Sequence, residues 1–209
     1  MPIKPFVADL SHHNRITSFV AARKAGLVGV ILKATEGSTY VDRTYLDMRK
    51  RAEDAGLLVG AYHFATNAPV KQQVEHFLSH IGEHADNVLL ALDYEPAARG
   101  RTMKIEQAAE WLRLVGKKSG QLPKLYSGHL IKETLPKYDA FFAKHDLWLA
   151  QYGAKPVCPK SWDNYWLWQF TGDGMGPKPH EYPGLGKNID LNTFARTETE
   201  LRAEWVREA

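Results

Sequence analysis

Eight short apolar runs recur along the 209-residue chain, and most are separated by stretches in which apolar residues have helical spacing. The runs predict strands near residues 5–10, 28–35, 57–65, 88–95, 123–127, 147–152, 166–171 and 189–194. The amphipathic stretches predict helices over about 15–25, 42–55, 70–84, 104–118 and 130–136. Strands that alternate with helices favour a parallel sheet with right-handed crossovers.

The pattern changes after residue 152, where the helical spacing stops and the connections become rich in Gly, Pro and Lys. The last three strands are therefore expected to be joined by loops. Because eight strands suggest closure, the sequence predicts an α/β fold, an irregular TIM-like (β/α)5(β)3 barrel with eight strands and about five helices. Thr197 and Glu200 have the spacing of a capping box, which predicts a further short helix at the C-terminus.

Composition narrows the function only slightly. A 44% hydrophobic chain of this length can bury one core and is short for two domains, so one domain over residues 1–209 is expected. The net charge of +3, without a run of five like charges, argues against nucleic-acid binding. A single Cys158 excludes an internal disulfide. No apolar segment fits a signal peptide or a membrane span, so a soluble protein without membrane insertion is expected.

The ends of the predicted strands carry the candidate chemistry, because barrels of this kind bind ligands there. The fourth strand ends in Asp93-Tyr94-Glu95, and side chains two apart on a strand project from one face, about 6.6 Å apart at roughly 3.3 Å per residue. Carboxylates this close raise one pKa, as a general acid near neutrality requires. For this motif alone, an ordinary solvated strand end is the simpler interpretation.

Other strand ends strengthen the chemical interpretation. They are polar as well, and aromatic residues lie near them in the sequence. The polar ends include Asp9, Glu36, Tyr62, Tyr126, Gln151, Tyr152 and Gln169, and the nearby aromatic residues include Trp148, Trp166 and Trp168. Carboxylates among flat aromatic faces suit a sugar ligand. Asp190 begins the eighth strand instead of ending it, so this rule does not place it.

Seven segments between residues 9 and 192 match one family in order: Asp9-Leu10-Ser11-His12-His13-Asn14, Lys33-Ala34-Thr35-Glu36-Gly37 with Tyr40 and Asp42, Gly60-Ala61-Tyr62-His63-Phe64, Asp93-Tyr94-Glu95, Trp148-Leu149-Ala150-Gln151-Tyr152, Trp168-Gln169-Phe170, and Ile189-Asp190-Leu191-Asn192. With these segments the chain resembles the family 25 glycoside hydrolases, the Chalaropsis-type lysozymes. Arg15 departs from the family pattern, which usually has Pro, Gly or Glu there.

The resemblance implies a cofactor-free muramidase that hydrolyses the β-1,4 bond between N-acetylmuramic acid and N-acetylglucosamine. By analogy, Glu95 would be the general acid and then the base, while Asp93 would orient the 2-acetamido group of the substrate. Asp9 and Asp190 would complete the catalytic set. The residues expected to bind substrate are Glu36, Tyr62, Tyr126, Trp148, Tyr152 and Gln169. Retention with acetamido assistance is expected, and an enzyme nucleophile or an inverting route stays open.

The expected partner is the glycan strand of bacterial peptidoglycan, attacked by a monomer outside the cytoplasmic membrane. No separate wall-binding module is expected in this chain, and release as a phage lysin or export without a signal peptide both stay open. One alternative is a non-catalytic barrel that binds peptidoglycan or chitin-type glycans, which the presence of Glu95 disfavours. Another is a chitin-degrading barrel, whose longer acidic motif is interrupted here by Leu89 and Ala91.

Three histidines provide the one other pattern that could bind a metal. His76, His80 and His84 recur every four residues on a predicted helix, a spacing that could ligate zinc. The H-E-x-x-H motif is missing, and neighbouring apolar residues mark a different face as the buried one. No metal site is therefore expected.

Overall fold

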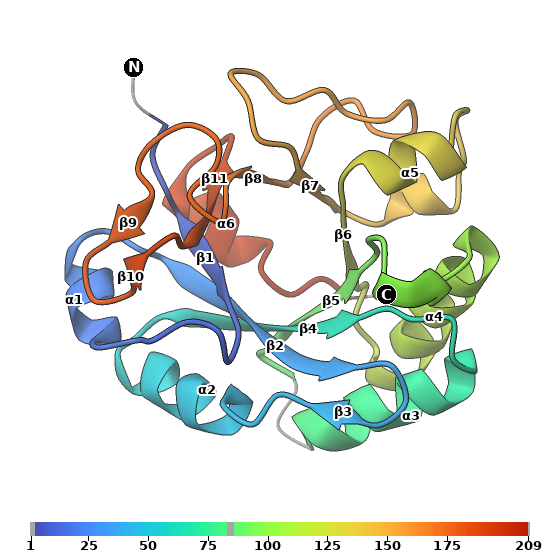
Figure 1. Cartoon of the computed structure of the whole chain (residues 1–209), viewed down its shortest axis with the longest axis horizontal. Coiled ribbons are helices and arrows are strands. Elements are labelled where there is room, and N and C mark those ends of the chain that lie inside the picture. Colours follow the sequence, from blue (N-terminus) through green and yellow to red (C-terminus); the bar gives the residue numbers. More distant parts are fainter. Residues whose placement is uncertain (1–2, 83–85, 209) are drawn as a thin grey trace.

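A computed structural model describes residues 3–82 and 86–208 and places eight strands in a closed barrel (Figure 1). In barrel order, the strands are β1 (Val7–Leu10), β2 (Gly29–Glu36), β4 (Leu58–Phe64), β5 (Leu89–Asp93), β6 (Lys124–Ser127), β7 (Leu147–Ala150), β8 (Leu167–Thr171) and β11 (Asp190–Phe194). Strand β1 pairs with both β2 and β11, which closes the sheet on itself. The predicted eight-stranded barrel is confirmed.

The direction of the last strand differs from the parallel arrangement that the sequence favours. Strands β1, β2, β4, β5, β6, β7 and β8 are parallel to their neighbours, but β11 is antiparallel to both β8 and β1. The chain leaves β8 and returns through a loop and a small hairpin, without a crossover helix, so β11 starts at the end of the barrel where β8 stops. The start of β11 therefore lies beside the carboxyl ends of the parallel strands, with Asp190 opposite Asp9.

Six α-helices accompany the barrel in the described part of the chain. The five predicted ones are α1 (Phe19–Lys24), α2 (Tyr45–Asp54), α3 (Val70–Ile81), α4 (Ile105–Ser119) and α5 (His129–Thr134), and α6 (Glu198–Ala203) follows β11. The capping box of α6 is confirmed, because the Glu200 amide donates to the Thr197 hydroxyl and the Thr197 amide donates to the Glu200 carboxylate. No helix among residues 3–82 and 86–208 is long and apolar enough to cross a membrane.

Several small elements have no counterpart in the sequence prediction. Strand β3 (Tyr40–Val41) extends the sheet beside β2, and β9 (Glu181–Tyr182) pairs with β10 (Gly186–Lys187) in a hairpin. Two 3₁₀ turns cover Ala98–Gly100 and Phe142–Lys144. Elements of two or three residues are too short to show a periodicity, so the hydrophobic pattern could not reveal them.

Strand side chains divide the interior into two cores. Alternate residues of β5 point outward under the helices, and the others point into the barrel. The outward set is Leu90, Leu92 and Tyr94, and the inward set begins with Leu89 and Ala91. Continuing the alternation makes Asp93 and Glu95 the next inward residues, which is how an apolar strand delivers two acids to the end of the barrel interior.

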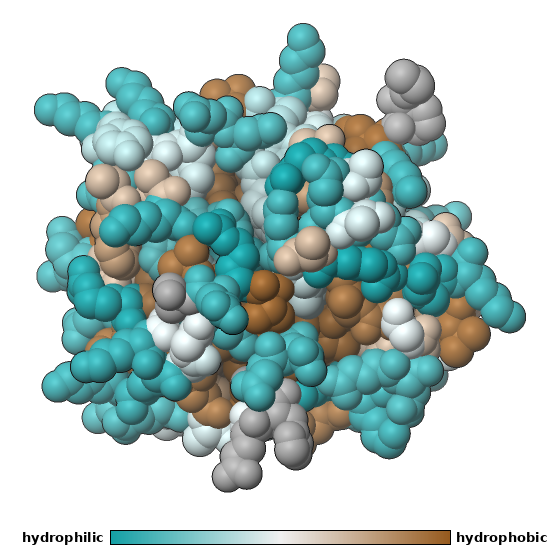
Figure 2. Space-filling model, turned by 180° about the vertical axis from the view of Figure 1, so that it is seen from behind, coloured by the Kyte–Doolittle hydropathy of each residue, from teal (hydrophilic) through white to brown (hydrophobic). Residues whose placement is uncertain are grey.

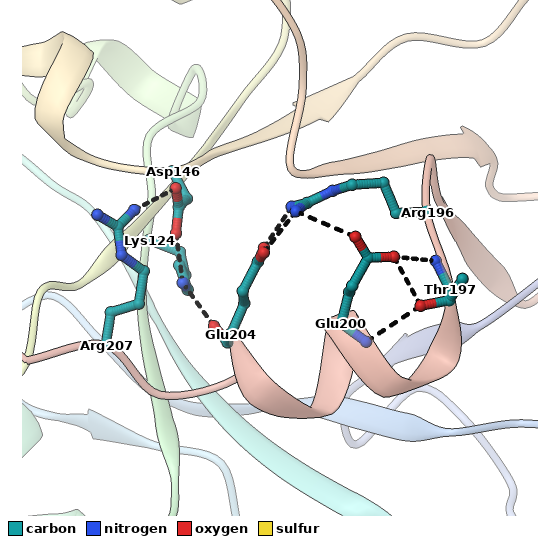
Figure 3. Close-up of polar contacts among 7 residues, drawn as sticks. All are labelled: Lys124, Asp146, Arg196, Thr197, Glu200, Glu204 and Arg207. Atoms are coloured by element: carbon teal, nitrogen blue, oxygen red, sulfur yellow. Dashed lines mark hydrogen bonds and ion pairs between the residues drawn. The ribbon is translucent and has the colours of Figure 1, made fainter.

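Aromatic and charged side chains close the barrel at the starts of its strands. Trp205, which follows α6, is 2% exposed, and its indole nitrogen donates to the Val59 carbonyl at 2.8 Å. The buried Lys124 ammonium donates to an Asp146 oxygen at 2.5 Å and to the Glu204 carbonyl at 3.0 Å (Figure 3). These partners compensate the cost of burying that charge.

The face of the molecule opposite to the view of Figure 1 is mostly polar. Figure 2 shows a face on which hydrophilic side chains dominate and hydrophobic residues are visible in patches between them. Large exposed hydrophobic side chains are scattered over different elements, among them Val20, Leu46, Tyr138, Tyr152 and Met175. Scattered exposure of this kind is ordinary for a folded domain and marks no interface by itself.

Removing the Trp205 ring should destabilise the barrel strongly. Trp205→Ala leaves a cavity against Trp166 and removes the bond to Val59, so we expect a loss of about 3–5 kcal/mol in the free energy of unfolding. Urea denaturation measures this loss. Tyr138→Ala, at a side chain 66% exposed, is the matched control and should change stability by less than about 0.5 kcal/mol. Equal effects of the two substitutions would contradict the assignment of Trp205 as a structural plug.

Candidate active site

A small acidic pocket of about 80 Å³ lies at the carboxyl ends of the parallel strands. Six strands contribute its lining, which consists of Asp9, Tyr62, Asp93, Glu95, Tyr126, Trp148 and Asp190. Seven of the ten site residues predicted from the sequence therefore meet in one place. The position agrees with the rule that barrels of this class bind ligands at the carboxyl ends of their strands.

A second pocket of about 240 Å³ adjoins the first. Glu95 and Tyr126 line both pockets, so the two spaces meet at these residues. The other lining residues of the larger space are Pro96, Gly128, His129, Ala150, Gln151 and Tyr152. A ligand longer than one ring could therefore occupy both spaces and pass Glu95.

A larger cavity of about 540 Å³ lies near the starts of β6 and β7, and its chemistry is different. Both arginines that line it have carboxylate partners: Arg207 contacts Asp146, and Arg196 contacts Glu204, which lies outside the lining (Figure 3). The smaller pocket instead gathers four carboxyl groups. Unusual charge, and not volume, identifies the site with catalytic potential.

Asp9 is the most firmly held carboxylate of the pocket. It is 8% exposed, and each oxygen accepts one amide hydrogen bond, from Asn192 Nδ2 at 2.7 Å and from Gln169 Nε2 at 2.9 Å. Burial raises the pKa of Asp9 to about 6, although the bonds from Asn192 and Gln169 oppose that shift. Asp9 is therefore mostly ionised at neutral pH.

Asp190 faces Asp9 across the β1–β11 pairing and behaves as its protonated partner. Burial, and then the charge of Asp9, raises the pKa of Asp190 to about 9. One Asp190 oxygen also accepts from the Asp173 amide at 3.2 Å. Two facing carboxyl groups thus share one negative charge at neutral pH, with a hydrogen bond between them.

Asp93 and Glu95 form the second acidic pair. Asp93 is 6% exposed, and among the described residues its Oδ1 has no hydrogen-bond partner. Burial, and then the charge of Glu95, raises the pKa of Asp93 well above its ordinary value. Burial, and then Asp9, raises the pKa of Glu95. Raised pKa values favour the protonated form that a general acid needs, and the unpartnered oxygen can accept a hydrogen bond from a ligand.

The three remaining predicted site residues lie around the pocket. Tyr152 lines the adjoining space and is 44% exposed. Gln169 is buried behind Asp9. Glu36 does not line either pocket: its carboxylate pairs with Lys33 Nζ at 2.8 Å and lies 3.8 Å from Arg101. Lys33 lowers the pKa of both Asp93 and Glu95, but burial and neighbouring carboxylates raise these two pKa values by more.

Two residues at the site were not among the predicted ones. Asn192 bonds to Asp9 and accepts from the Trp148 indole nitrogen at 2.5 Å. Its position two residues after Asp190 on the same strand was an available signal, since alternation aims both into the barrel. Asp173 reaches Asp190 through its backbone amide from a loop position with φ of 50°, and no sequence pattern indicates that contact.

The histidine pattern shows no metal site in the part that is described. His76 Nε2 lies 2.8 Å from the Tyr40 carbonyl, and His80 packs against Tyr45. His84 lies outside the described residues. Within residues 3–82 and 86–208, no cluster of three or more His, Cys, Asp or Glu side chains could hold a metal ion.

Comparison with known sequences identifies the protein family of this chain. The model of glycosyl hydrolases family 25 matches residues 8–178, and the chain therefore belongs to that family. It is 28% identical to the autolytic lysozyme of Clostridium acetobutylicum over 200 residues, which cover 90% of this chain and 55% of the relative. It is 27% identical to the N,O-diacetylmuramidase of Chalaropsis over 181 residues, with 77% and 85% covered.

Length differs among the relatives. The chain is 28% identical over 175 residues to the uncharacterised protein YegX of Escherichia coli O157:H7, and the match covers 82% of this chain. It spans only 61% of that relative, about three fifths of its length.

Solved structures show the same fold. The bacterial lysozyme of Streptomyces coelicolor superposes with a TM-score of 0.83 at 24% identity, with 95% of each chain covered. The muramidase of Trichobolus zukalii superposes with a TM-score of 0.81 at 26% identity, covering 95% of this chain and 97% of the other. These likenesses confirm the irregular barrel that the sequence predicts.

Asp190→Asn should stabilise the protein at alkaline pH. Because burial and Asp9 raise the pKa of Asp190 to about 9, its favourable contribution to stability is complete below the unfolded value of 3.8 and declines as the pH rises toward 9. Asparagine mimics the protonated group at every pH. We expect a gain above ~1.4 kcal/mol at pH 8 that shrinks toward pH 4, measured by urea unfolding.

The exposed Asp163→Asn is the control for this measurement, and its effect should be small and flat across the same pH range. A wild-type protein whose stability rises between pH 4 and pH 8 in parallel with the Asp190→Asn variant would refute the protonated state of Asp190.

Proposed function

We propose that this chain is a lysozyme, a 1,4-β-N-acetylmuramidase that cleaves the bond between N-acetylmuramic acid and N-acetylglucosamine in bacterial peptidoglycan. The observation that carries the proposal is the pair Asp93 and Glu95, a buried and a partly buried acid with raised pKa values in one pocket at the carboxyl ends of the strands. Membership of family 25 and the lysozymes and muramidases among its relatives support this choice of substrate.

Glu95 acts as the general acid in the proposed reaction. It lines both pockets, so a glycosidic oxygen that bridges sugars in the two spaces lies beside it. Its raised pKa favours the protonated acid, and that proton goes to the leaving oxygen as the glycosidic bond breaks. The resulting carboxylate then takes a proton from water in the second step.

Asp93 positions the internal nucleophile. Its unpartnered Oδ1 accepts the N–H of the substrate 2-acetamido group, which turns the acetamido oxygen toward the anomeric carbon. That oxygen forms a new bond to the carbon as the leaving group departs, giving a cyclic oxazolinium ion. Water opens the ring from the opposite side, so two inversions give net retention, the substrate-assisted exception to the two-carboxylate scheme.

The other residues of the pocket provide charge and contact surface. The shared negative charge of Asp9 and Asp190 stabilises positive charge that develops at the anomeric carbon. The aromatic residues Tyr62, Tyr126, Trp148 and Tyr152 are proposed sugar contacts, and Glu36 a peripheral one. We also propose that the barrel works as one catalytic unit and as a monomer, without a cofactor, on glycan strands outside the cytoplasmic membrane.

Glu95→Gln should abolish cleavage while leaving binding intact. The amide keeps the size of the side chain but cannot deliver the proton, so we expect kcat to fall by at least about 100-fold, the lower end of general-acid contributions. The measurement is the appearance of muramic-acid reducing ends in purified peptidoglycan, read by mass spectrometry. Glu106→Gln, the same change at an exposed position of α4, should retain full activity.

Two other outcomes of that experiment are informative. Binding without cleavage by the wild-type protein would support a non-catalytic glycan-binding barrel. Release of N-acetylglucosamine reducing ends, or cleavage of chitin in preference to peptidoglycan, would contradict the muramidase specificity.

The first product should have the β configuration at its new reducing end. Acetamido assistance inverts the anomeric carbon twice, and proton NMR in the first minutes of reaction distinguishes β from α before mutarotation mixes them. The same mechanism predicts that glycan lacking the N-acetyl group on muramic acid resists cleavage. An α product would exclude the substrate-assisted route.

A further inference from the structure

A buried amide connects Asp9 to two tyrosines of the adjoining pocket. Gln169 is 1% exposed, and its nitrogen donates to Asp9 at 2.9 Å. Its oxygen accepts from the Tyr126 hydroxyl and from the Tyr152 hydroxyl, both at 3.1 Å. Gln169 was expected to bind substrate directly, yet burial leaves it almost no surface for a ligand, and its oxygen already has two donors.

The chemistry of its partners fixes which way the Gln169 amide points. A carboxylate can only accept, so the amide nitrogen must face Asp9. Burial raises the pKa of the Tyr126 and Tyr152 hydroxyls, which therefore keep their protons and can donate to the amide oxygen. The flipped amide would place its oxygen against the Asp9 carboxylate, where neither group can donate, and would lose the bond to Asp9.

Asn192 is oriented by the same logic on the other Asp9 oxygen. The Trp148 indole nitrogen is a donor only, so it requires the Asn192 oxygen as its acceptor. The Asn192 nitrogen is thereby turned to Asp9 and to the Val7 carbonyl. Asp9 is thus held by two amides that cannot rotate independently of the residues behind them.

We propose that Gln169 is a positioning residue for the reaction. It holds the Asp9 carboxylate in place at the acidic pocket. Because its oxygen accepts the hydroxyl protons of Tyr126 and Tyr152, both tyrosines can offer only oxygen lone pairs to the ligand. A ligand in the larger pocket must then offer donors, as the hydroxyl groups of a neutral sugar do, and anionic groups are disfavoured there. This inference rests on the proposed muramidase function and assigns a role that direct substrate contact would not give.

Several other titratable groups lie near Asp9 and also contribute to the pH dependence of activity. They come from four strands and the segment after a fifth: Tyr62 on β4, Asp93 and Glu95 at the end of β5, Tyr126 on β6, Tyr152 after β7, and Asp190 on β11. Lys33 on β2 is the cation acting on the Asp93 and Glu95 pair. These groups are common to the wild type and to the glutamine variants below, so a difference in pH profile among those proteins reports on the substituted glutamine.

Gln169→Glu and Gln169→Met separate positioning from packing. The carboxylate of the first variant can accept from both tyrosines but cannot donate to Asp9 until it takes up a proton. We expect kcat near neutrality to fall about 100-fold, as for a misplaced catalytic group, and activity to recover partly at lower pH. Gln169→Met, which has no polar side-chain atoms, should lose activity at every pH without that recovery.

The matched control is Gln73→Met. Gln73 is the other fully buried glutamine, bonded to His63 and Thr66 on the outer side of the sheet, away from the pocket. Its replacement should lower stability while the pH profile of the remaining activity keeps the wild-type shape. An identical pH profile for the Gln73→Met, Gln169→Glu and wild-type proteins would show that Gln169 only packs and would overturn the proposal.

A carboxyl titration tests the inference without relying on activity. Carbon-13 NMR of the aspartate side chains should show a higher pKa for Asp9 in Gln169→Met, because a donor to the ionised form is lost. An unchanged Asp9 titration in a folded variant would refute the positioning role. If the wild-type protein released no muramic-acid ends, the proposed function would fail, yet this titration would still decide whether Gln169 holds Asp9.

Tyr152→Phe tests the tyrosine half of the proposal at a half-exposed position, where folding is least at risk. Removing its hydroxyl takes away one lone-pair acceptor at the larger pocket. We expect KM to rise several-fold, with kcat within about twofold of the wild type, since the bond to Asp9 remains. An unchanged KM would contradict the acceptor role of Tyr152.

Discussion

The pairing of β1 with β11 is the constraint on which the site depends. It closes the barrel, and because β11 runs antiparallel to β1, it sets Asp190 directly opposite Asp9. Had the last strand been parallel, its first residues would have been at the other end of the barrel. The same hydrogen-bonded seam therefore completes the fold and brings two carboxyl groups together, of which only Asp9 is mostly ionised at neutral pH.

Burial raises the pKa of all four carboxyl groups in the small pocket, and neighbouring carboxylates add to the effect for Asp93, Glu95 and Asp190. The opposite end of the barrel carries the compensating interactions, where Trp205 fills the interior and Lys124 is satisfied by Asp146 and a backbone carbonyl (Figure 3). Apolar packing and paired charges at the strand starts thus offset the free-energy cost of burying carboxyl groups at the strand ends. Such a balance is expected where the needs of activity oppose stability.

Much of this arrangement was predictable from local pattern. The alternation along β5 predicted that Asp93 and Glu95 share a face, and the strand-end rule assembled Asp9, Tyr62 and Tyr126. The direction of β11 was not predictable, because hydrophobic periodicity is the same for a strand read either way. Contacts made by backbone atoms of a loop, as from Asp173, leave no trace in side-chain pattern.

The burial of Gln169 was equally hidden from the sequence. From the sequence, the polar Gln169 at the end of an apolar strand is expected to contact the ligand. In the structure it instead forms hydrogen bonds with a carboxylate on one side and two hydroxyl groups on the other. Only the three-dimensional partners distinguish these roles. Strand-end position identifies which residues lie near a site, but not which of them face the ligand and which stand behind it.

The choice of amides around Asp9 explains how the pocket keeps its charge. An arginine or lysine in the place of Gln169 or Asn192 would have held Asp9 as firmly, but it would have cancelled the negative field that a cationic transition state needs. Neutral donors fix the carboxylate and lower its pKa only partly, leaving it near 6. The nearby cation, Lys33, is itself paired with Glu36, so its influence on Asp93 and Glu95 is attenuated. The neutral amides thus orient Asp9 without cancelling its charge, and that negative charge stays available to the reaction in a pocket that gathers four carboxyl groups.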